Sequence, residues 1–291
     1  MKKFIDKITF LIVCFNSSYV IKKCIKSVNS KAKILIVENS NNYLIKKELE
    51  KEFSNVKVVI AGKNLGYGAG NNLGISKIKT PYAFIMNPDS ILKKNCINEL
   101  YKAVKFLENK FKILAPEPID DFGFFLKNYS EDRFTNILPV DYVKGFAMLI
   151  NLRRINFRKL FDENFFLFLE EIDLCKRIHD LYRDKKEIFL VKKAKVSHVA
   201  KKSSGDNFNI KLCRDWHWMW SLYYYNKKHF GRFTAYKATV YKLVLSLIKI
   251  IFSIFLMRKI NFLKYKYRIY GVLNAYLGKS SWLRPEMIHE K

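Results

Sequence analysis

The chain of 291 residues is short of acidic side chains. Asp and Glu number 26 against 54 Lys and Arg, which leaves a formal net charge of +28. The shortage is greatest in residues 201–291, where 18 basic residues face 4 acidic ones and no acid occurs between Asp215 and Glu286. Such an excess predicts an anionic partner: nucleic acid, a membrane surface or a phosphorylated substrate.

The sequence lacks the motifs that are typical of several classes of protein. No helix-turn-helix, zinc-finger or RNA-recognition pattern occurs, so we expect no nucleic acid partner, and a nucleic-acid-binding protein is the remote alternative. The N-terminus is expected to carry no signal peptide, because Asp6 comes early and the apolar run that follows is short. No pair among the five cysteines has Cys-x-x-Cys spacing, which predicts free, buried thiols in a reducing compartment. These are Cys14, Cys24, Cys96, Cys175 and Cys213.

What is present is an alternation of apolar strand patterns and amphipathic helix patterns. It predicts an α/β fold, with a mostly parallel sheet flanked by helices. We expect residues 1–205 to form this domain and residues 206–291 to form a basic, aromatic, helical tail. Strands are predicted over 8–13, 34–37, 56–60, 82–86, 113–115, 188–191 and 194–198, and helices over 18–28, 42–53, 65–78, 93–109 and 208–277, with a loop over 116–140.

Polar or glycine-rich segments follow each of the first four predicted strands. Parallel sheets bind their ligands at the carboxyl ends of the strands, so these segments predict one binding cleft. They are Phe15-Asn16, Glu38-Asn39-Ser40, residues 62–74 and residues 87–90.

Asn87-Pro88-Asp89 and His198 are the candidate metal-binding residues. A carboxylate at a strand end suits a hard divalent cation such as Mg²⁺ or Mn²⁺, with phosphate oxygens and water completing the shell. The alternative for Asn87-Pro88-Asp89 is an ordinary turn and helix cap. His198 ends a predicted strand, and its imidazole is either a second ligand or a structural side chain.

Two further segments are candidates for binding a nucleotide. The carboxylate of Glu38 is placed to accept a hydrogen bond from the N3–H of uracil or thymine, or else caps the next helix. The glycine-rich segment from Asn64 to Gly74 lets the backbone approach a phosphate or sugar closely. It resembles a dinucleotide-binding turn, but such a turn would follow the first strand, where no glycine occurs.

Three carboxylates lie within four residues at Glu170, Glu171 and Asp173. Like charges this close raise one another's pKa, which suits a general base. The alternative is a charged first turn of a helix, which the helix dipole favours.

Taken together, these segments resemble a family 2 glycosyltransferase with the GT-A fold, near the bacterial rhamnosyltransferase-like branch. The similarity runs in order over roughly residues 8–205. It rests on the segments above and on Gly145, residues 147–150, residues 161–166, residues 170–177 and His198.

The resemblance implies an inverting transfer of a sugar from a nucleotide-diphosphate donor to a saccharide acceptor. The favoured donor is dTDP-rhamnose, and a UDP-hexose is the next. Glu171 would be the base, with Glu170 or Asp173 as substitutes, and Asp89 and His198 would hold the cation. The donor-binding residues would be Phe15, Asn16, Glu38, Asn64, Gly66, Asn71, Asn87 and Asp89. Two residues depart from the family pattern, since Asn87 and Glu171 each replace an aspartate. The alternative function is a nucleotidyltransferase or an inactive sugar-nucleotide-binding module of the same fold.

The tail combines aromatic and basic residues. Tryptophans and tyrosines cluster over residues 216–225 just before Lys227-Lys228, a composition that favours an anionic membrane surface. Residues 243–257 are apolar but interrupted by Lys249, and they are short for a span of ~20 residues. We expect an in-plane helix or packed hairpin on the inner face of the bacterial cell membrane, with a lipid-linked acceptor for cell-surface polysaccharide. The alternatives are helices that only pack on the catalytic domain, or a true span.

Overall fold

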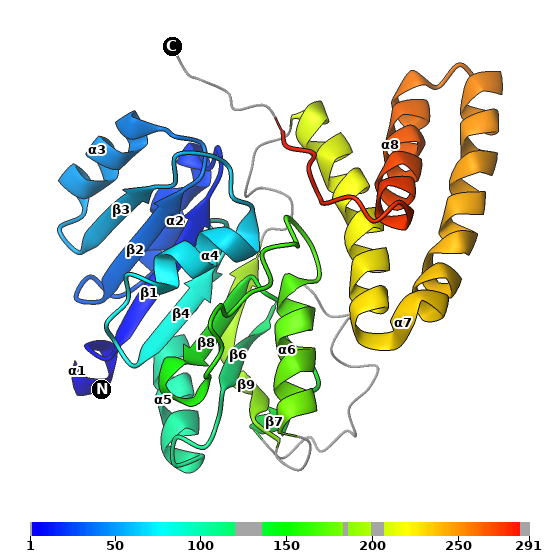
Figure 1. Ribbon diagram of the computed structural model, residues 1–291. Coiled ribbons are helices and arrows are strands. Elements are labelled where there is room, and N and C mark those ends of the chain that lie inside the picture. Colours follow the sequence, from blue (N-terminus) through cyan, green and yellow to red (C-terminus); the bar gives the residue numbers. More distant parts are fainter. Residues whose placement is uncertain (1, 120–135, 183–185, 199–206, 286–291) are drawn as a thin grey trace.

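The computed structural model describes residues 2–119, 136–182, 186–198 and 207–285 (Figure 1). Within these ranges nine strands form one mixed sheet in the order β3-β2-β1-β4-β8-β6-β9-β5, and β7 pairs with β9. The strands are β1 Ile8–Cys14, β2 Lys33–Glu38, β3 Val56–Ile60, β4 Tyr82–Met86, β5 Ser90–Leu92, β6 Ile113–Pro118, β7 Ile137–Pro139, β8 Ala147–Asn151 and β9 Ile188–His198. The helices are α1 Lys2–Ile5, α2 Ser18–Ser27, α3 Tyr43–Glu52, α4 Tyr67–Ile75, α5 Cys96–Phe106, the 3₁₀ turn η1 Leu152–Arg154, α6 Glu170–Leu181, α7 Phe208–Phe255 and α8 Lys259–Tyr276.

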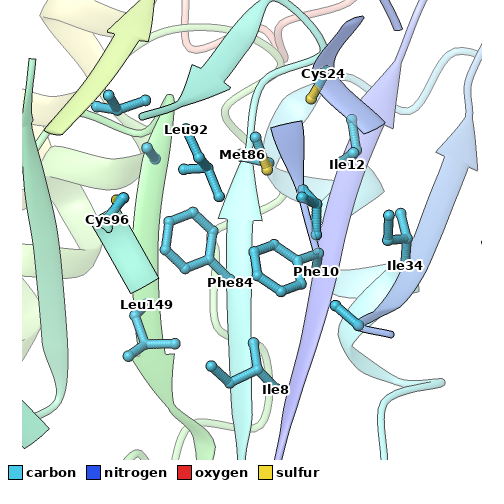
Figure 2. Packing of buried hydrophobic residues seen from close by; sticks show 14 of the residues in the cluster. Ile8, Phe10, Ile12, Cys24, Ile34, Phe84, Met86, Leu92, Cys96 and Leu149 are labelled. Carbon is cyan, nitrogen blue, oxygen red and sulfur yellow. The ribbon is translucent and has the colours of Figure 1, made fainter. Parts of the chain in front are cut away.

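The predicted buried strands β1, β2 and β4 form the centre of the domain and pair in parallel. Their side chains alternate between two apolar layers, so a strand with helices on both faces reads as one continuous apolar run. Phe10 of β1 stacks on Phe84 of β4 with ring centroids 5.1 Å apart, in the layer covered by α2 and α5 (Figure 2). Leu11 and Ile85 point into the opposite layer, which α4 and α6 cover. All five cysteines are free and buried, as predicted.

The prediction of a mostly parallel sheet holds only for the first half of the domain. Strand β8 runs antiparallel to both β4 and β6, and β9 is antiparallel to β5 and β7 while parallel to β6. A parallel pair needs a long crossover, usually a helix, whereas antiparallel strands do not. Beyond α5 no helix lies between β6, β7 and β8 in the part of the chain that is described, so this constraint is lost.

Strand β9 differs from its prediction in a way that matters for the site. It is one strand of 11 residues instead of two short ones, and its far end pairs with the short strand β5, which the sequence pattern did not predict. In this pairing Ser90 lies opposite His198, which brings the end of β9 beside the segment that follows β4.

The tail is helical over the range predicted and folds back on itself. Gly231, with φ 85° and ψ 169°, breaks α7 into a first segment, residues 208–230, and a second segment, residues 232–255. Helix α8 then returns along both (Figure 1). A Cβ at Gly271 would lie 2.2 Å from the carbonyl oxygen of Trp216, so α8 approaches the first segment at backbone contact. The predicted boundary between residues 205 and 206 lies outside the described residues.

The first segment of α7 packs on the α/β domain. Ser221 Oγ donates to the carbonyl oxygen of Leu167 at 2.7 Å, and the hydroxyl of Tyr224 donates to Asp162 Oδ2 at 3.0 Å. The expected alternative in which tail helices pack on the catalytic domain is thus correct for this segment. The second segment and α8 form a hairpin, and most of the apolar stretch of α7 is exposed.

Candidate active site

A cavity of about 530 Å³ opens at the carboxyl ends of the central strands. All four predicted strand exits contribute to it, through Phe15, Asn39, the pair Asn64 and Gly66, and the pair Asn87 and Pro88. The opposite part of its lining comes from the loop before α6, the start of α6 and the first segment of α7. The prediction that one cleft lies at this edge of the sheet is therefore confirmed.

Asp89 and His198 lie together because β5 pairs with the end of β9. Asp89 Oδ1 is 3.3 Å from His198 Nε2, and the imidazole stacks on the ring of Phe146 with centroids 4.4 Å apart. Asn87 Nδ2 is 3.5 Å from the same ring nitrogen. His198 lines the cavity, while Asp89 is buried next to it.

The surroundings of Asp89 fit a divalent cation. Both of its carboxylate oxygens are buried, and neither accepts a hydrogen bond from a residue that the structure describes. A buried carboxylate without donors costs free energy unless a cation offsets its charge. Among the described residues no three His, Cys, Asp or Glu side chains converge on one point, so the protein would supply two ligands and the diphosphate the others.

Glu170 and Glu171 open α6, and both line the cavity. Glu170 is buried, and its Oε2 has no hydrogen-bond partner among the described residues. Glu171 is half-buried, so it is the more exposed residue of the two. Burial raises the pKa of both carboxyl groups, and the neighbouring Glu171 charge raises the pKa of Glu170 further. Hydrogen bonding from the backbone of Gly145 and Ile172 opposes the rise in the pKa of Glu171.

Asp173 is separated from this pair. It is fully buried outside the cavity, where its Oδ1 lies 2.6 Å from Lys228 Nζ and 2.8 Å from His229 Nε2. Its Oδ2 accepts a hydrogen bond from Arg177 Nε at 2.8 Å. Three basic groups therefore hold this carboxylate between α6 and α7, where an acceptor hydroxyl has no access. The choice of base is left between Glu170 and Glu171.

The predicted donor-binding residues divide into two groups. Phe15, Asn64, Gly66 and Asn87 line the cavity, whereas Asn16, Glu38, Asn71 and Asp89 are not part of the lining.

Glu38 is engaged in the turn after β2. Its carboxylate accepts hydrogen bonds from the backbone N–H of Ser40 at 3.0 Å and of Asn42 at 2.7 Å, and from the Ser40 hydroxyl. The capping alternative is wrong, because the N-cap of α3 is Asn42 and Glu38 bonds only to the turn before it, while contact of Glu38 with a nucleotide base stays a prediction. Asn39, its neighbour, lines the cavity with an Oδ1 that has no described partner.

The glycine-rich segment makes its close approaches to protein atoms. A Cβ at Gly66, where φ is 81°, would lie 2.4 Å from the carbonyl oxygen of Phe166. The Gly66 carbonyl accepts a hydrogen bond from Asn39 Nδ2 at 3.0 Å. A Cβ at Gly74 would lie 2.2 Å from Leu11 Cδ1. These glycines thus pack α4 on the sheet and against the loop before α6.

Several lining residues were not predicted. Tyr67 lies beside the acidic pair: its hydroxyl donates to the carbonyl oxygen of Gly145, and burial and the charges of Glu170 and Glu171 raise its pKa. Its position inside the glycine-rich motif was a signal that could have identified it. The tail residues carry no such signal, because only the packing of α7 brings them here. They are Ile210, Cys213, Arg214, Trp218 and Pro285.

Comparisons with known proteins agree with this geometry. Residues 9–165, more than half of the chain, match the family model for glycosyl transferase family 2. A curated relative, the low-salt glycan biosynthesis hexosyltransferase Agl10 of Haloferax volcanii, is 26% identical over 137 residues. That match covers 40% of this chain and 44% of the relative, so the chain aligns with less than half of the relative's length.

Two solved structures share the fold. The mannosyltransferase PcManGT from Pyrobaculum calidifontis, in complex with GDP-Man and Mn²⁺, superposes with a TM-score of 0.55 at 10% identity, covering 94% of this chain and 88% of that one. GalNAc-T7 with UDP, GalNAc and Mn²⁺ gives a TM-score of 0.54 at 13% identity, over 76% of this chain and 50% of that one. At these identities the likeness concerns the fold alone, an α/β GT-A architecture with a mixed sheet. On the family match, this chain belongs to glycosyl transferase family 2.

Proposed function

We propose that this protein is an inverting glycosyltransferase that moves a hexose from a nucleotide-diphosphate donor to a saccharide acceptor. One observation carries the proposal. A single cavity at the strand ends is lined by Glu170 and Glu171 and by His198, which is paired with the buried Asp89. A base and an anion-neutralising site in one cavity are what displacement of a nucleoside diphosphate requires.

Glu171 is the proposed base. Its half-buried carboxylate removes the proton from the acceptor hydroxyl as that oxygen attacks the anomeric carbon. Glu170, with a more strongly raised pKa, stays protonated over a wider pH range and is the poorer base. A divalent cation held by Asp89 and His198 would offset the charge that develops on the departing diphosphate. Binding on the two sides of the cavity holds donor and acceptor in line.

The identity of the donor is a finer proposal. The curated relative is a hexosyltransferase of glycan biosynthesis, which supports a hexose and a role in glycan synthesis. The proposal that this donor is dTDP-rhamnose or a UDP-hexose rests on the resemblance in sequence. Thermal stabilisation by a panel of nucleotide sugars, with and without Mn²⁺, separates these donors, because a ligand that binds the native state raises its stability.

The test of the function is substitution of Glu171 by Gln. We expect at least a hundredfold loss of sugar transfer, because a positioned general base contributes roughly 10²–10⁴-fold to the rate. Thermal stabilisation by the donor with Mn²⁺ should persist. The matched control is Glu99→Gln, which removes a carboxylate on α5 that pairs with Lys102. Full transfer by the Glu171→Gln variant would overturn the assignment, and formation of a nucleotide sugar from a nucleoside triphosphate and a sugar phosphate would favour a nucleotidyltransferase.

We further propose that the hairpin of α7 and α8 rests on an anionic membrane, on its inner face in a bacterium. α7 is the one helix in the described ranges that is long and apolar enough to cross a membrane, which is weak support for a span. At the tip of the hairpin Phe255 is 86% exposed and Met257 92% exposed. Lys249, Arg258 and Lys259, close to them in the sequence, are also exposed. Exposed apolar side chains flanked by basic ones fit the interface of an anionic bilayer.

A further inference from the structure

The cavity has a second wall that the α/β domain does not supply. Ile210, Cys213, Arg214 and Trp218 of α7, with Pro285, line it together with the loop before α6. In Figure 1 the first segment of α7 lies on the far side of α6 and β8 from strands β2 and β3. The cavity lining thus combines a strand-exit wall, made by residues that follow the strands, with an α7 wall. The strand-exit wall contains Asn87 and His198, next to the candidate cation site. The α7 wall is therefore the side left for the acceptor.

One cation in the α7 wall, Arg214, has no anionic partner among the residues that the structure describes. The guanidinium of Arg214 forms no ion pair and no hydrogen bond within the described part of the chain, and its carbon lies 5.5 Å from the centre of the Phe168 ring. Asp215, the adjacent acid in the sequence, pairs instead with Arg268 at 2.6 Å. A half-buried guanidinium against an aromatic ring, without a carboxylate, keeps its fork of N–H donors available for a phosphate.

The rest of this wall is apolar. Trp218 meets Phe168 edge to face with centroids 5.6 Å apart, and Leu169, Ile210 and Pro285 complete the surface. An apolar wall with a single unpaired cation fits an amphipathic anion better than a free, neutral saccharide, whose hydroxyls would lose hydrogen bonds here.

The position of α7 indicates which amphipathic anion is bound. The same helix that forms this wall continues through the kink at Gly231 into the exposed apolar hairpin. A lipid held at the hairpin could thus present its phosphate to the cavity along one helix. We propose that the α7 wall is the acceptor subsite, that Arg214 binds the phosphate of a lipid phosphate that carries the acceptor, and that Trp218 and Phe168 contact the adjoining group. This rests on the proposed transferase function.

The test is binding of farnesyl phosphate to the full chain, below the concentration at which this lipid forms micelles. Farnesol, inorganic phosphate, and UDP with Mn²⁺ are the comparison ligands, and titration calorimetry gives each dissociation constant. We expect Arg214→Gln to weaken farnesyl phosphate about tenfold to a hundredfold, as for loss of hydrogen bonds to a charged group, and Arg214→Lys to weaken it less. The control Arg158→Gln, which removes an exposed arginine outside the cavity, should change nothing.

Three outcomes would overturn the proposal. Equal binding of farnesol and farnesyl phosphate would show that the phosphate contributes nothing to binding. Equal binding of inorganic phosphate and farnesyl phosphate would show that the lipid contributes nothing. Weaker UDP–Mn²⁺ binding by Arg214→Gln, with farnesyl phosphate unchanged, would assign Arg214 to the donor. These measurements need no turnover, so they are independent of the Glu171→Gln assay. Thermal unfolding of the Arg214 variants verifies that each is folded, and a Trp218→Ala variant with unaltered farnesyl phosphate affinity would count against the aromatic contact.

Discussion

At the scale of single residues, burial separates three acids that look equivalent in the sequence. Glu170, Glu171 and Asp173 lie within four residues, yet their surroundings differ. Glu170 is buried with no described partner on Oε2, Glu171 is half-buried in the cavity, and Asp173 is held by basic groups. Consecutive positions on a helix point about 100° apart, so neighbouring side chains meet different surroundings. Repulsion is strongest within the pair in the cavity, where the Glu171 charge raises the pKa of Glu170 more than the Asp173 charge does, and the protonation of this pair can be tested by experiment.

We expect Glu170→Gln to leave the acidic limb of the rate–pH profile where it is. Glu171 acts as a base only when ionised, and burial raises its pKa, so the rate rises with pH through that pKa. Glu170 has the more strongly raised pKa, so it is still protonated and uncharged where Glu171 ionises, and replacing it by neutral Gln removes no charge there. The rate of sugar transfer measured across pH tests this expectation. A limb that moves to lower pH would show that Glu170 ionises before Glu171.

The same substitution should stabilise the fold at high pH. A carboxyl group whose pKa is raised on folding contributes stability below its unfolded pKa, and that contribution is lost as the pH rises through the folded pKa. The pKa of Glu170 is raised well above its ordinary value, and Gln carries no such loss. The melting temperature of the variant, relative to the native chain, should therefore increase from acid to alkaline pH. A difference that is constant with pH would contradict the expectation.

Asp89→Asn tests the cation site. Both oxygens of Asp89 are buried and accept no hydrogen bond within the described ranges, so removing its charge should not destabilise the metal-free protein. The extra thermal stabilisation that Mn²⁺ confers in the presence of UDP should fall to that of UDP alone. The control is Asp6→Asn, which alters an exposed acid. Undiminished stabilisation by Mn²⁺ in the Asp89 variant would place the cation elsewhere.

At the scale of elements, α6 and the first segment of α7 act as one unit. Phe168 and Leu169, just before the acidic pair, have φ of 71° and 69°, a left-handed conformation that is costly for such residues and persists only where neighbours enforce it. Trp218 packs on Phe168, and Ser221 holds the carbonyl of Leu167. The tail therefore helps to hold the loop that positions Glu171.

The ionic contacts of Asp173 make the strongest link between these helices. We expect Asp173→Asn to lower the free energy of unfolding by about 3–5 kcal/mol, because Lys228 and His229 lose a buried partner. Asp180→Asn on the same helix removes a half-exposed pair with Lys176 and should cost less than about 1 kcal/mol. Urea unfolding of both variants gives the comparison. Equal losses would show that the buried contact carries no special weight.

At the scale of the whole molecule, one helix joins the cavity to the exposed hairpin (Figure 1). A transferase with this arrangement would rest on a bilayer with its α7 wall next to the lipid. Most of the exposed apolar side chains of the tail lie on the second segment of α7 and the turn after it.

We expect the protein to sediment with vesicles that contain phosphatidylglycerol and to bind neutral phosphatidylcholine vesicles weakly. Phe252→Asp with Phe255→Asp should abolish this binding without lowering the melting temperature, because both side chains are exposed. Phe106→Asp on α5, also exposed, is the matched control. Membrane fractions that resist carbonate extraction would instead indicate a span.

The sequence by itself determined the first half of the site. Continuous apolar runs predicted β1, β2 and β4, because buried parallel strands need no polar face, and polar residues directly after them predicted the cleft. These are local features, since each strand and its exit lie within ten residues.

The tertiary structure decided the rest, for a physical reason. The pairing of β5 with β9 brings Asp89 to His198 across 109 positions of sequence, and α7 brings Arg214 and Trp218 to a cavity formed by strands far upstream. Helical periodicity predicts only that a face of α7 is apolar. Such a face is equally compatible with packing in a core, contact with lipid or lining a cavity. Contacts between distant residues, which no local pattern encodes, place this face of α7 in the lining of the cavity.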